Sequence, residues 1–171
     1  MFEIIKFENS TEQISYQLSL SASFLRSHFI INDLILNGDL IEAFTLIRKQ
    51  LEILTRLHEI DKKPLFKLLK KTPNVVNLFK DGGKQLYPTL SEIAHFATPR
   101  VGELLTVKTF DDGSIGPSVH PAYNIDALAC YDRHAYVSIY FVFWFMEFLK
   151  KIYGHSYECE SDEMTFFILR D

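Results

Sequence analysis

The stretch LNGDLIE, residues 36–42, decides the fold because it ends one long helical pattern and opens another. Gly38 is a natural helix stop, and Asp39 followed three residues later by Glu42 is a pattern that begins helices. Apolar residues recur at intervals of three and four on both sides of this stretch, as they do in amphipathic helices. The sequence therefore predicts two long antiparallel helices joined at Gly38.

The first helix is predicted to open at a capping box formed by Ser10 and Gln13, and the second to run to about Ile60. An amphipathic helix buries its apolar stripe. The predicted stripes are Ile14, Leu18, Ala22, Leu25, Phe29 and Leu36 on the first helix, and Leu40, Phe44, Ile47, Leu51 and Leu54 on the second. Glu42, Lys49 and Arg56 mark the predicted solvent face of the second helix.

Two further main helices are predicted. One covers about three turns from Tyr87 and stops at Thr98-Pro99. The other is capped by Asn124, ends at Gly154, and contains the apolar run 135–146, which we expect to be a buried central helix.

Short helices are expected between Asp61 and Gly83, and a loop or small hairpin around Asp112-Gly113 within residues 101–123. The prediction is a single all-α domain over 1–171. It is a bundle of four main helices with short extra helices and one long loop or small hairpin near 101–123.

Composition excludes several classes of protein. The formal net charge of −4 argues against a surface that is basic throughout, as in many nucleic-acid binders. Cys130 and Cys159 are too few for a disulfide scaffold and form no CxxC pair. The N-terminus has no signal-peptide pattern, and the run 135–146 is shorter than the roughly 20 residues that span a bilayer. We therefore expect a cytoplasmic protein with no membrane partner.

The polar residues most suited to chemistry lie on two of these helices. Tyr87, Ser91 and His95 are four residues apart and share one helical stripe, and Arg48 and Glu52 form an equivalent pair on the second helix. One interpretation is a partly buried hydrogen-bond network that braces the two helices, with Arg48, Glu52 and His95 mutually bonded and mostly buried, because buried charges are tolerated only when paired. The other is a catalytic site with His95 as acid or base, Arg48 stabilising an anion, and Tyr87 or Ser91 positioning substrate.

Other catalytic and cofactor signatures are missing from the sequence. Ser91 and His95 lack the GxSxG context of a serine hydrolase. No metal-binding spacing such as HExxH or CxxC occurs, although His95, His120 and His134 are candidates to meet in space, which leaves a metal or small-molecule sensor as a third hypothesis. No phosphate-binding glycine loop is present either. Because both kinds of signature are missing from the sequence, we expect no cofactor and no bound metal.

The segment KKPLFKLLKK, residues 62–71, is the one positive cluster. As a nucleic-acid site it would contact phosphates through Lys63, Lys67, Lys70 and Lys71. The favoured interpretation is the solvated face of a short amphipathic helix, with Leu65, Phe66, Leu68 and Leu69 turned inward.

Arg48-x3-Glu52 and Tyr87-x2-Leu90-Ser91-x3-His95 resemble the motifs of uncharacterised bacterial all-helical families, in which an RxxxE helix precedes a YxxLSxxxH helix, a loop and a final long helix. The resemblance covers residues 40–150. It implies a cytosolic helical bundle loosely similar to the HEPN-type bundles of bacterial defence and toxin systems. HEPN ribonucleases carry an Arg followed by His after four to six residues, and none of Arg26, Arg48, Arg56, Arg100 or Arg133 has a histidine at that offset.

The leading functional hypothesis is thus an interaction or regulatory module without catalysis, whose partner is another protein or a second copy bound through the aromatic helix 125–153. The alternative is a HEPN-like nuclease or other hydrolase that uses His95 and Arg48.

Overall fold

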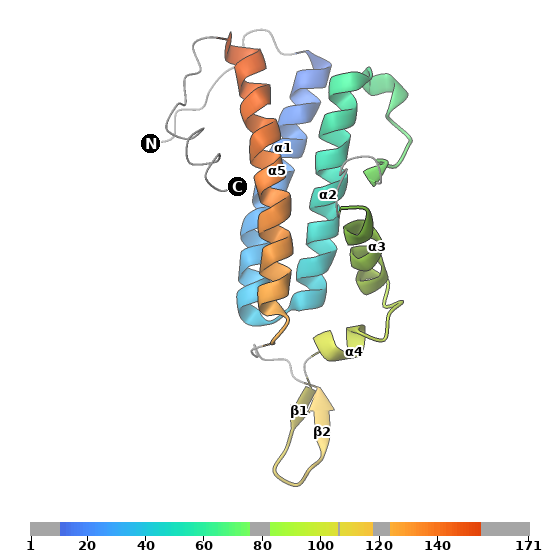
Figure 1. Ribbon diagram of the computed structural model, residues 1–171, viewed down its shortest axis with the longest axis vertical. Coiled ribbons are helices and arrows are strands. Elements are labelled where there is room, and N and C mark those ends of the chain that lie inside the picture. Colours follow the sequence, from blue (N-terminus) through green and yellow to red (C-terminus); the bar gives the residue numbers. More distant parts are fainter. Residues whose placement is uncertain (1–10, 76–82, 106, 118–123, 155–171) are drawn as a thin grey trace. The chain divides into compact units, whose positions relative to one another are not determined.

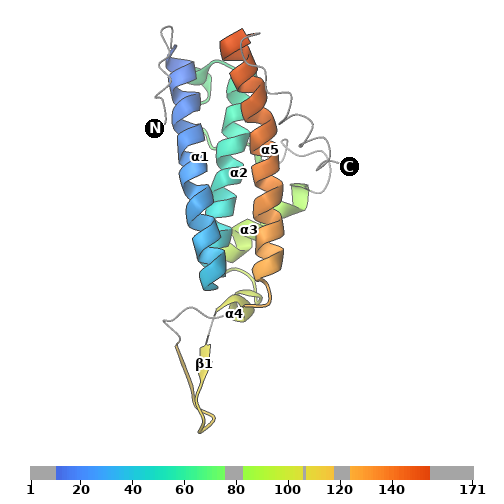
Figure 2. The ribbon, with the colours of Figure 1, turned by 90° about the vertical axis from the view of Figure 1, so that its left-hand side faces the viewer.

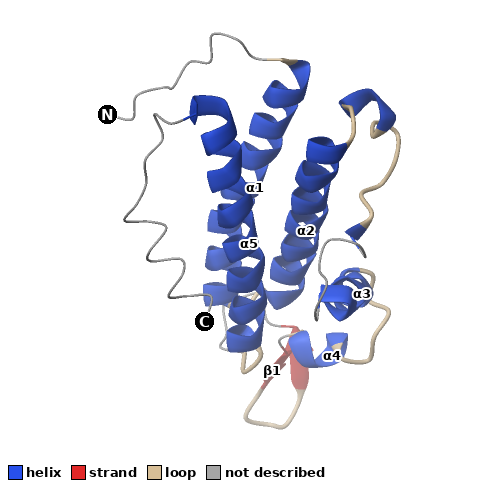
Figure 3. Cartoon of the chain, turned by 45° about the horizontal axis from the view of Figure 1, so that its top comes forward, coloured by secondary structure: helices blue, strands red, loops and turns tan. Residues whose placement is uncertain are grey.

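The computed structural model describes residues 11–75, 83–105, 107–117 and 124–154, and most of them are helical (Figures 1 and 3). In chain order the elements are α1 (Glu12–Asn37), α2 (Leu40–Lys62), the 3-10 helix η1 (Leu65–Lys67), α3 (Gly83–Ala94), α4 (Val101–Leu104), β1 (Val107–Thr109), β2 (Ile115–Pro117) and α5 (Ala127–Tyr153). The predicted all-α fold with four main helices, short helices and a small hairpin is confirmed.

Packing divides the chain within α5, into residues 1–138 and residues 139–171. That the whole chain forms one domain stays a prediction.

The α1–α2 hairpin forms where the sequence places it, and the two helices lie side by side (Figures 1 and 2). Gly38 adopts the left-handed conformation with φ 80°, and its N–H donates to the Ile35 carbonyl over 3.1 Å. The next N–H, of Asp39, donates to the Leu34 carbonyl over 2.9 Å. These bonds satisfy carbonyls at the end of α1 while the chain reverses.

The start of α1 differs from the predicted capping box by one residue. Thr11 caps the helix, and its hydroxyl oxygen accepts a hydrogen bond from the Ile14 N–H over 3.2 Å. Ser10 lies outside the described residues. The Gln13 side chain donates to the Ile60 carbonyl over 3.0 Å, so it joins α1 to the end of α2 instead of completing a cap.

In residues 1–138, α2 is the central helix, since α1, α3 and α4 all contact it. Its buried residues include the predicted stripe and extend around the helix: Leu40, Ile41, Ala43, Phe44, Ile47, Gln50, Leu51, Ile53, Leu54, Thr55, Arg56, Leu57 and Ile60. The run 135–146, predicted to be a buried central helix, contains the buried residues Val137, Phe141, Trp144 and Met146. Its central position stays a prediction.

The predicted stripe of α1 was also wrong. The buried positions are Gln17, Ser21, Phe24, Ser27, Ile31 and Ile35, whereas Leu25, Phe29 and Leu36 are 44%, 67% and 84% exposed. Burial of the two serines is tolerated because each hydroxyl donates to a carbonyl of the preceding turn, at 2.9 Å for Ser21 and 2.8 Å for Ser27. The buried face of α1 is therefore partly polar, and an apolar row faces outward.

The segment expected to be irregular begins with the single turn of α4 and then forms the hairpin. β1 and β2 pair antiparallel with Lys108 opposite Gly116. Gly113 has φ 81° in the connecting turn, which is where Asp112-Gly113 predicted a reversal. Arg100 and Asp126 form an ion pair of 2.7 Å that links the region before α4 to the chain just before α5.

In the second part, the rings of α5 stack on one another along the helix. The Phe141 and Phe145 centroids are 5.6 Å apart, and the Trp144 and Phe148 centroids are 4.9 Å apart. Gly154 follows the helix with φ 61°, as the sequence predicted for its end.

Candidate functional site

The site is built by α3 lying against α2. Leu90 and Ile93 of α3 are fully buried and anchor one face of this short helix, while Leu51 and Leu54 of α2 are fully buried on the central helix. Tyr87 lies one turn before Leu90 and therefore points toward the same neighbour. This apolar packing brings Tyr87 to the Arg48–Glu52 pair.

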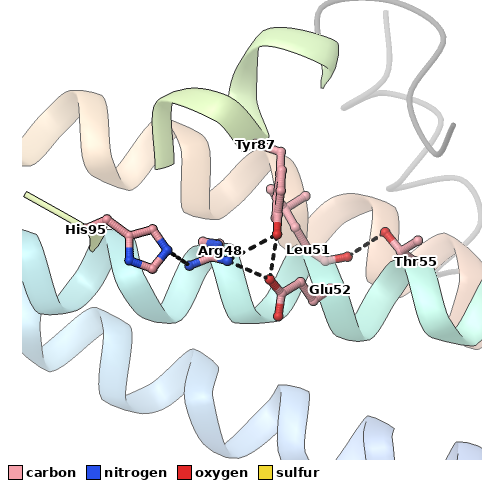
Figure 4. Close-up of polar contacts among 6 residues, drawn as sticks. All are labelled: Arg48, Leu51, Glu52, Thr55, Tyr87 and His95. Atoms are coloured by element: carbon pink, nitrogen blue, oxygen red, sulfur yellow. Dashed lines mark hydrogen bonds and ion pairs between the residues drawn. The ribbon is translucent and has the colours of Figure 1, made fainter. Parts of the chain in front are cut away.

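Arg48, Glu52 and Tyr87 form a closed group of hydrogen bonds (Figure 4). Arg48 donates through Nη2 to the Tyr87 hydroxyl oxygen at 3.2 Å, and the same nitrogen lies 3.3 Å from Glu52 Oε1. The Tyr87 hydroxyl in turn donates to Glu52 Oε1 over 2.8 Å. The guanidinium carbon also lies 5.3 Å from the centre of the Tyr87 ring, within the range of a cation–π contact.

His95 extends the group at its exposed end. Its Nε2 lies 3.2 Å from Arg48 Nη1. Because a guanidinium only donates, Nε2 must be the acceptor, and the proton of the neutral ring is then on Nδ1. His95 follows the last residue of α3, just before Phe96 with φ 55°, where the helix ends.

The predicted bonding of Arg48 to Glu52, Tyr87 and His95 is confirmed, and Arg48, Glu52 and Tyr87 are partly buried. The prediction that His95 is mostly buried was wrong. Arg48 and Glu52 side chains are 23% and 33% exposed, and His95 is exposed. The reason is local: His95 lies beyond the end of α3, so no further turn of that helix covers it. Arg48 Nε is buried and has no partner among the described residues.

Ser91 does not join the group. The buried residues Leu90 and Ile93 show that the face of α3 turned to α2 is centred beside Ser91, not on it. Within the described residues, no hydrogen bond of the Ser91 hydroxyl to Arg48, Glu52 or His95 is formed. The arrangement therefore contains no Ser–His nucleophile pair.

Arg56, expected on the solvent face, is 8% exposed and organises a second polar cluster. It donates to the carbonyl of Leu68 over 2.8 Å and to that of Lys71, and Nη1 lies 3.4 Å from Glu59 Oε2. Glu59 also accepts from the Asn74 N–H over 3.1 Å. The prolines after Lys63 interrupt the helical pattern and predict a loop, whose backbone carbonyls need hydrogen-bond donors. The sequence does not show that Arg56 is the donor.

The four lysines proposed for nucleic acid, Lys63, Lys67, Lys70 and Lys71, are all exposed, as is Lys62. The inward placement of the apolar residues between them was half right. Leu65 and Leu68 are buried, whereas Phe66 and Leu69 are 72% and 45% exposed. A 3-10 turn explains the difference, because residues three apart share a face and the pair 66/69 lies on another face from 65/68.

Sequence reasoning missed a pair of histidines, one on α1 and one on the first part of α5, whose rings lie in contact at an angle of 43°. The rings of His28 and His134 have centroids 4.5 Å apart, and His28 Nδ1 lies 3.1 Å from Ser138 Oγ. His134 is 1% exposed, and its Nε2 has no partner in the described part of the chain. Burial, with a smaller contribution from His28, lowers the pKa of His134 to about 4, so the ring is neutral near pH 7.

No group of three or more His, Cys, Asp or Glu side chains suited to a metal is found among the described residues. His120 and Cys159, two residues discussed above, lie outside those residues. Cys130 is buried and free, and burial raises the pKa of its thiol to about 12. Such a thiol is a poor nucleophile.

Comparisons of the chain with protein-family models, with curated proteins and with solved structures find no match. In the ranges 11–75, 83–105, 107–117 and 124–154, no helix is both long and apolar enough to cross a bilayer.

Proposed function

We propose that this chain is a non-catalytic interaction or regulatory module of a cytoplasmic, bacterial helical-bundle type, in which the Arg48 group joins α3 to α2. The observation that carries the proposal is the Tyr87 hydroxyl, which donates to Glu52 at 2.8 Å and accepts from Arg48 at 3.2 Å. A hydroxyl that both donates and accepts a hydrogen bond within its own chain is suited to holding two helices together. It is poorly suited to positioning a substrate.

The proposed partner is a second copy of this chain, bound through the beginning of the aromatic helix. Ile125, just before α5, and Leu128 and Tyr131, in its first turns, are 83%, 70% and 52% exposed and recur every third residue. Exposed large apolar side chains gathered in this way favour a protein interface. Burial of such side chains stabilises association by about 1.5 kcal/mol or more each when it is complete.

Light scattering coupled to size-exclusion chromatography tests this partner. The wild-type chain is expected to elute as a dimer, and Leu128→Lys as a monomer with unchanged helical circular dichroism. Phe29→Lys, which charges the exposed row of α1, is the matched variant and should leave the dimer intact. A wild-type monomer at all concentrations, or a dimer lost only with Phe29→Lys, would reject the interface on α5.

A nuclease or hydrolase of the HEPN-like kind is the second candidate, and one contact favours it. Arg48 lies on α2 and His95 just beyond the end of α3, yet the two lie 3.2 Å apart, at an exposed position where an anionic substrate has access. The pairing of a cation with an imidazole is suited to phosphate-ester chemistry, in which the cation stabilises developing negative charge. The His95 ring would then exchange the proton.

RNA cleavage by the purified chain distinguishes the two functions. The module predicts no turnover that depends on His95, and the nuclease predicts turnover that disappears in His95→Ala while the fold is retained. Ser91→Ala, next to the group but not bonded to it, is the matched control and should retain any genuine activity. Turnover lost in His95→Ala but not in Ser91→Ala would overturn the module.

A further inference from the structure

Residues 62–71, here called the lysine turn, carry five exposed lysines and no acidic residue. The whole chain has a formal charge of −4, so this turn is a local positive site on an otherwise acidic protein. The two acidic residues just before it bond elsewhere: Glu59 to Arg56, and Asp61 to the Gln17 amide at 3.0 Å. A surface of this kind attracts an anionic partner.

The backbone of the lysine turn is fixed from within. Arg56 donates to the carbonyls of Leu68 and Lys71, and Lys70 adopts a left-handed φ of 70°. Leu65 and Leu68 pack with Ile60 in a small core that Tyr16 and Leu20 complete. The turn therefore presents its outer side chains without first having to become ordered, which lowers the entropic cost of binding.

The outer side chains alternate in chemistry. In a 3-10 turn residues three apart lie above one another. Leu65 and Leu68 form the buried face, and Phe66 and Leu69 form an exposed apolar edge. Lys67 lies beside this edge, with its ammonium 5.8 Å from the centre of the Phe66 ring, and Lys70, beyond the end of the 3-10 helix, is exposed. Lys62, Lys63 and Lys71 stand at the two ends. An apolar edge is thus bordered by ammonium groups.

We propose that the lysine turn docks this protein on an anionic membrane surface. Phe66 and Leu69 enter the boundary between headgroups and acyl chains, and the lysines contact the negative headgroups around them. Both halves of this arrangement are needed for stable peripheral binding, since apolar insertion and attraction to anionic lipid each contribute only part of the affinity. Docking of this kind needs no helix that spans the bilayer.

The same residues fit nucleic acid less well. Single-stranded nucleic acid is held by bases stacked on open aromatic faces. The one ring in the turn is Phe66, and the ammonium of Lys67 lies 5.8 Å from its centre, where a base would stack. Leu69 offers no ring. An exposed aliphatic side chain beside that ring gains most from an apolar environment.

Flotation with lipid vesicles tests the proposal on the full chain. We expect binding to vesicles of phosphatidylcholine mixed with phosphatidylserine, little binding to pure phosphatidylcholine, and loss of binding at high salt. Phe66→Ser combined with Leu69→Ser should weaken binding by roughly tenfold or more. Lys67→Gln combined with Lys70→Gln should do the same, because each lysine near an anionic surface contributes about a fivefold effect.

The hairpin supplies a matched control. Lys108 lies 5.1 Å from the centre of the Phe110 ring, and that ring is 45% exposed, so it repeats the lysine–phenylalanine pair of the turn at another place. Lys108→Gln combined with Phe110→Ser should leave vesicle binding unchanged. Equal losses for the two sites would show that binding depends on overall charge and apolarity, and would reject the lysine turn as the docking site.

A fluorescent probe reports insertion directly. Trp144 is the one tryptophan of the chain, so Phe66→Trp in a Trp144→Phe background places a single indole in the turn. Its emission should shift to the blue on phosphatidylserine vesicles and stay unchanged with polyuridylate RNA. No shift on vesicles, or tighter binding to the RNA that depends on the lysines but not on Phe66, would overturn the membrane proposal.

Discussion

The Tyr87 hydroxyl of α3 lies between two residues of α2, 3.2 Å from the Arg48 guanidinium and 2.8 Å from the Glu52 carboxylate. It adds a polar attachment to the apolar one made by the buried Leu90 and Ile93. The two attachments differ in what they specify. Apolar burial holds α3 against α2, whereas the directional bonds at Tyr87 fix how far it slides along α2.

Tyr87→Phe should therefore loosen α3 without unfolding the chain. The change removes two hydrogen bonds and keeps the ring beside the guanidinium. We expect a loss of about 1 to 2 kcal/mol in the free energy of unfolding, measured by denaturant titration. Ser91→Ala, on the same helix but not bonded to the group, is the control and should change stability by less than about 0.5 kcal/mol.

A double-mutant cycle with Glu52→Gln separates the shared bond from the rest. If Tyr87 and Glu52 act together, the double variant should lose less stability than the sum of the single variants. Additive losses would show that the hydroxyl and the carboxylate are energetically independent, contrary to the closed group in Figure 4.

Arg56→Met should be the more damaging change, because Arg56 is buried and bonds two backbone carbonyls and Glu59. The substitution leaves those groups without partners, and we expect a loss of about 2 to 4 kcal/mol. Amide hydrogen exchange should accelerate in residues 65–71 first. Arg26→Met, on the exposed side of α1, should have little effect, and equal stability of the two variants would contradict the role of Arg56.

The fold was largely predictable because the residues that end helices and reverse the chain act through local backbone conformation. Gly38 and Asp112-Gly113 specify reversals through the backbone conformations that their residues allow. The buried face of α1 was not predictable from hydrophobic spacing. Ser21 and Ser27 can be buried because their hydroxyls bond carbonyls of their own helix, whereas Phe29 is left exposed. A pattern of apolar residues does not show which neighbour a helix meets.

The candidate site was partly predictable for a similar reason. Spacing of four placed Arg48 with Glu52 on one face of α2, and Tyr87 with His95 on one side of α3. It also included Ser91, which the packing of Leu90 and Ile93 excludes. The buried positions of Arg56 and His134 depend on partners distant in sequence, the Lys71 carbonyl and the His28 ring. The spacing of residues along one helix does not predict such contacts.

The Cys130 thiol should resist modification in the folded chain. Burial raises its pKa to about 12, so thiolate is scarce at pH 8 and the sulfur is covered. In a Cys159→Ser background, reaction with Ellman's reagent should be slow in buffer and immediate in denaturant. Rapid reaction of the native chain would show that the first part of α5 opens readily or does not cover the thiol.

Stability in acid should depend on His134. Burial lowers the pKa of this histidine from 6.5 to about 4 in the folded chain, so between these values the unfolded chain binds more protons. Its neutral form therefore stabilises the fold fully above about pH 6.5, and this contribution is lost as the pH falls toward 4. The loss is on the order of 3 kcal/mol.

His134→Leu should flatten the stability profile between pH 6.5 and 4, measured by denaturant titration at each pH. His28→Gln should retain most of the slope, because burial contributes more to the lowered pKa of His134 than the neighbouring His28 does. A profile equally steep in His134→Leu and the wild-type chain would assign the acid sensitivity to other groups. His58 is the next to substitute, since burial also lowers its pKa.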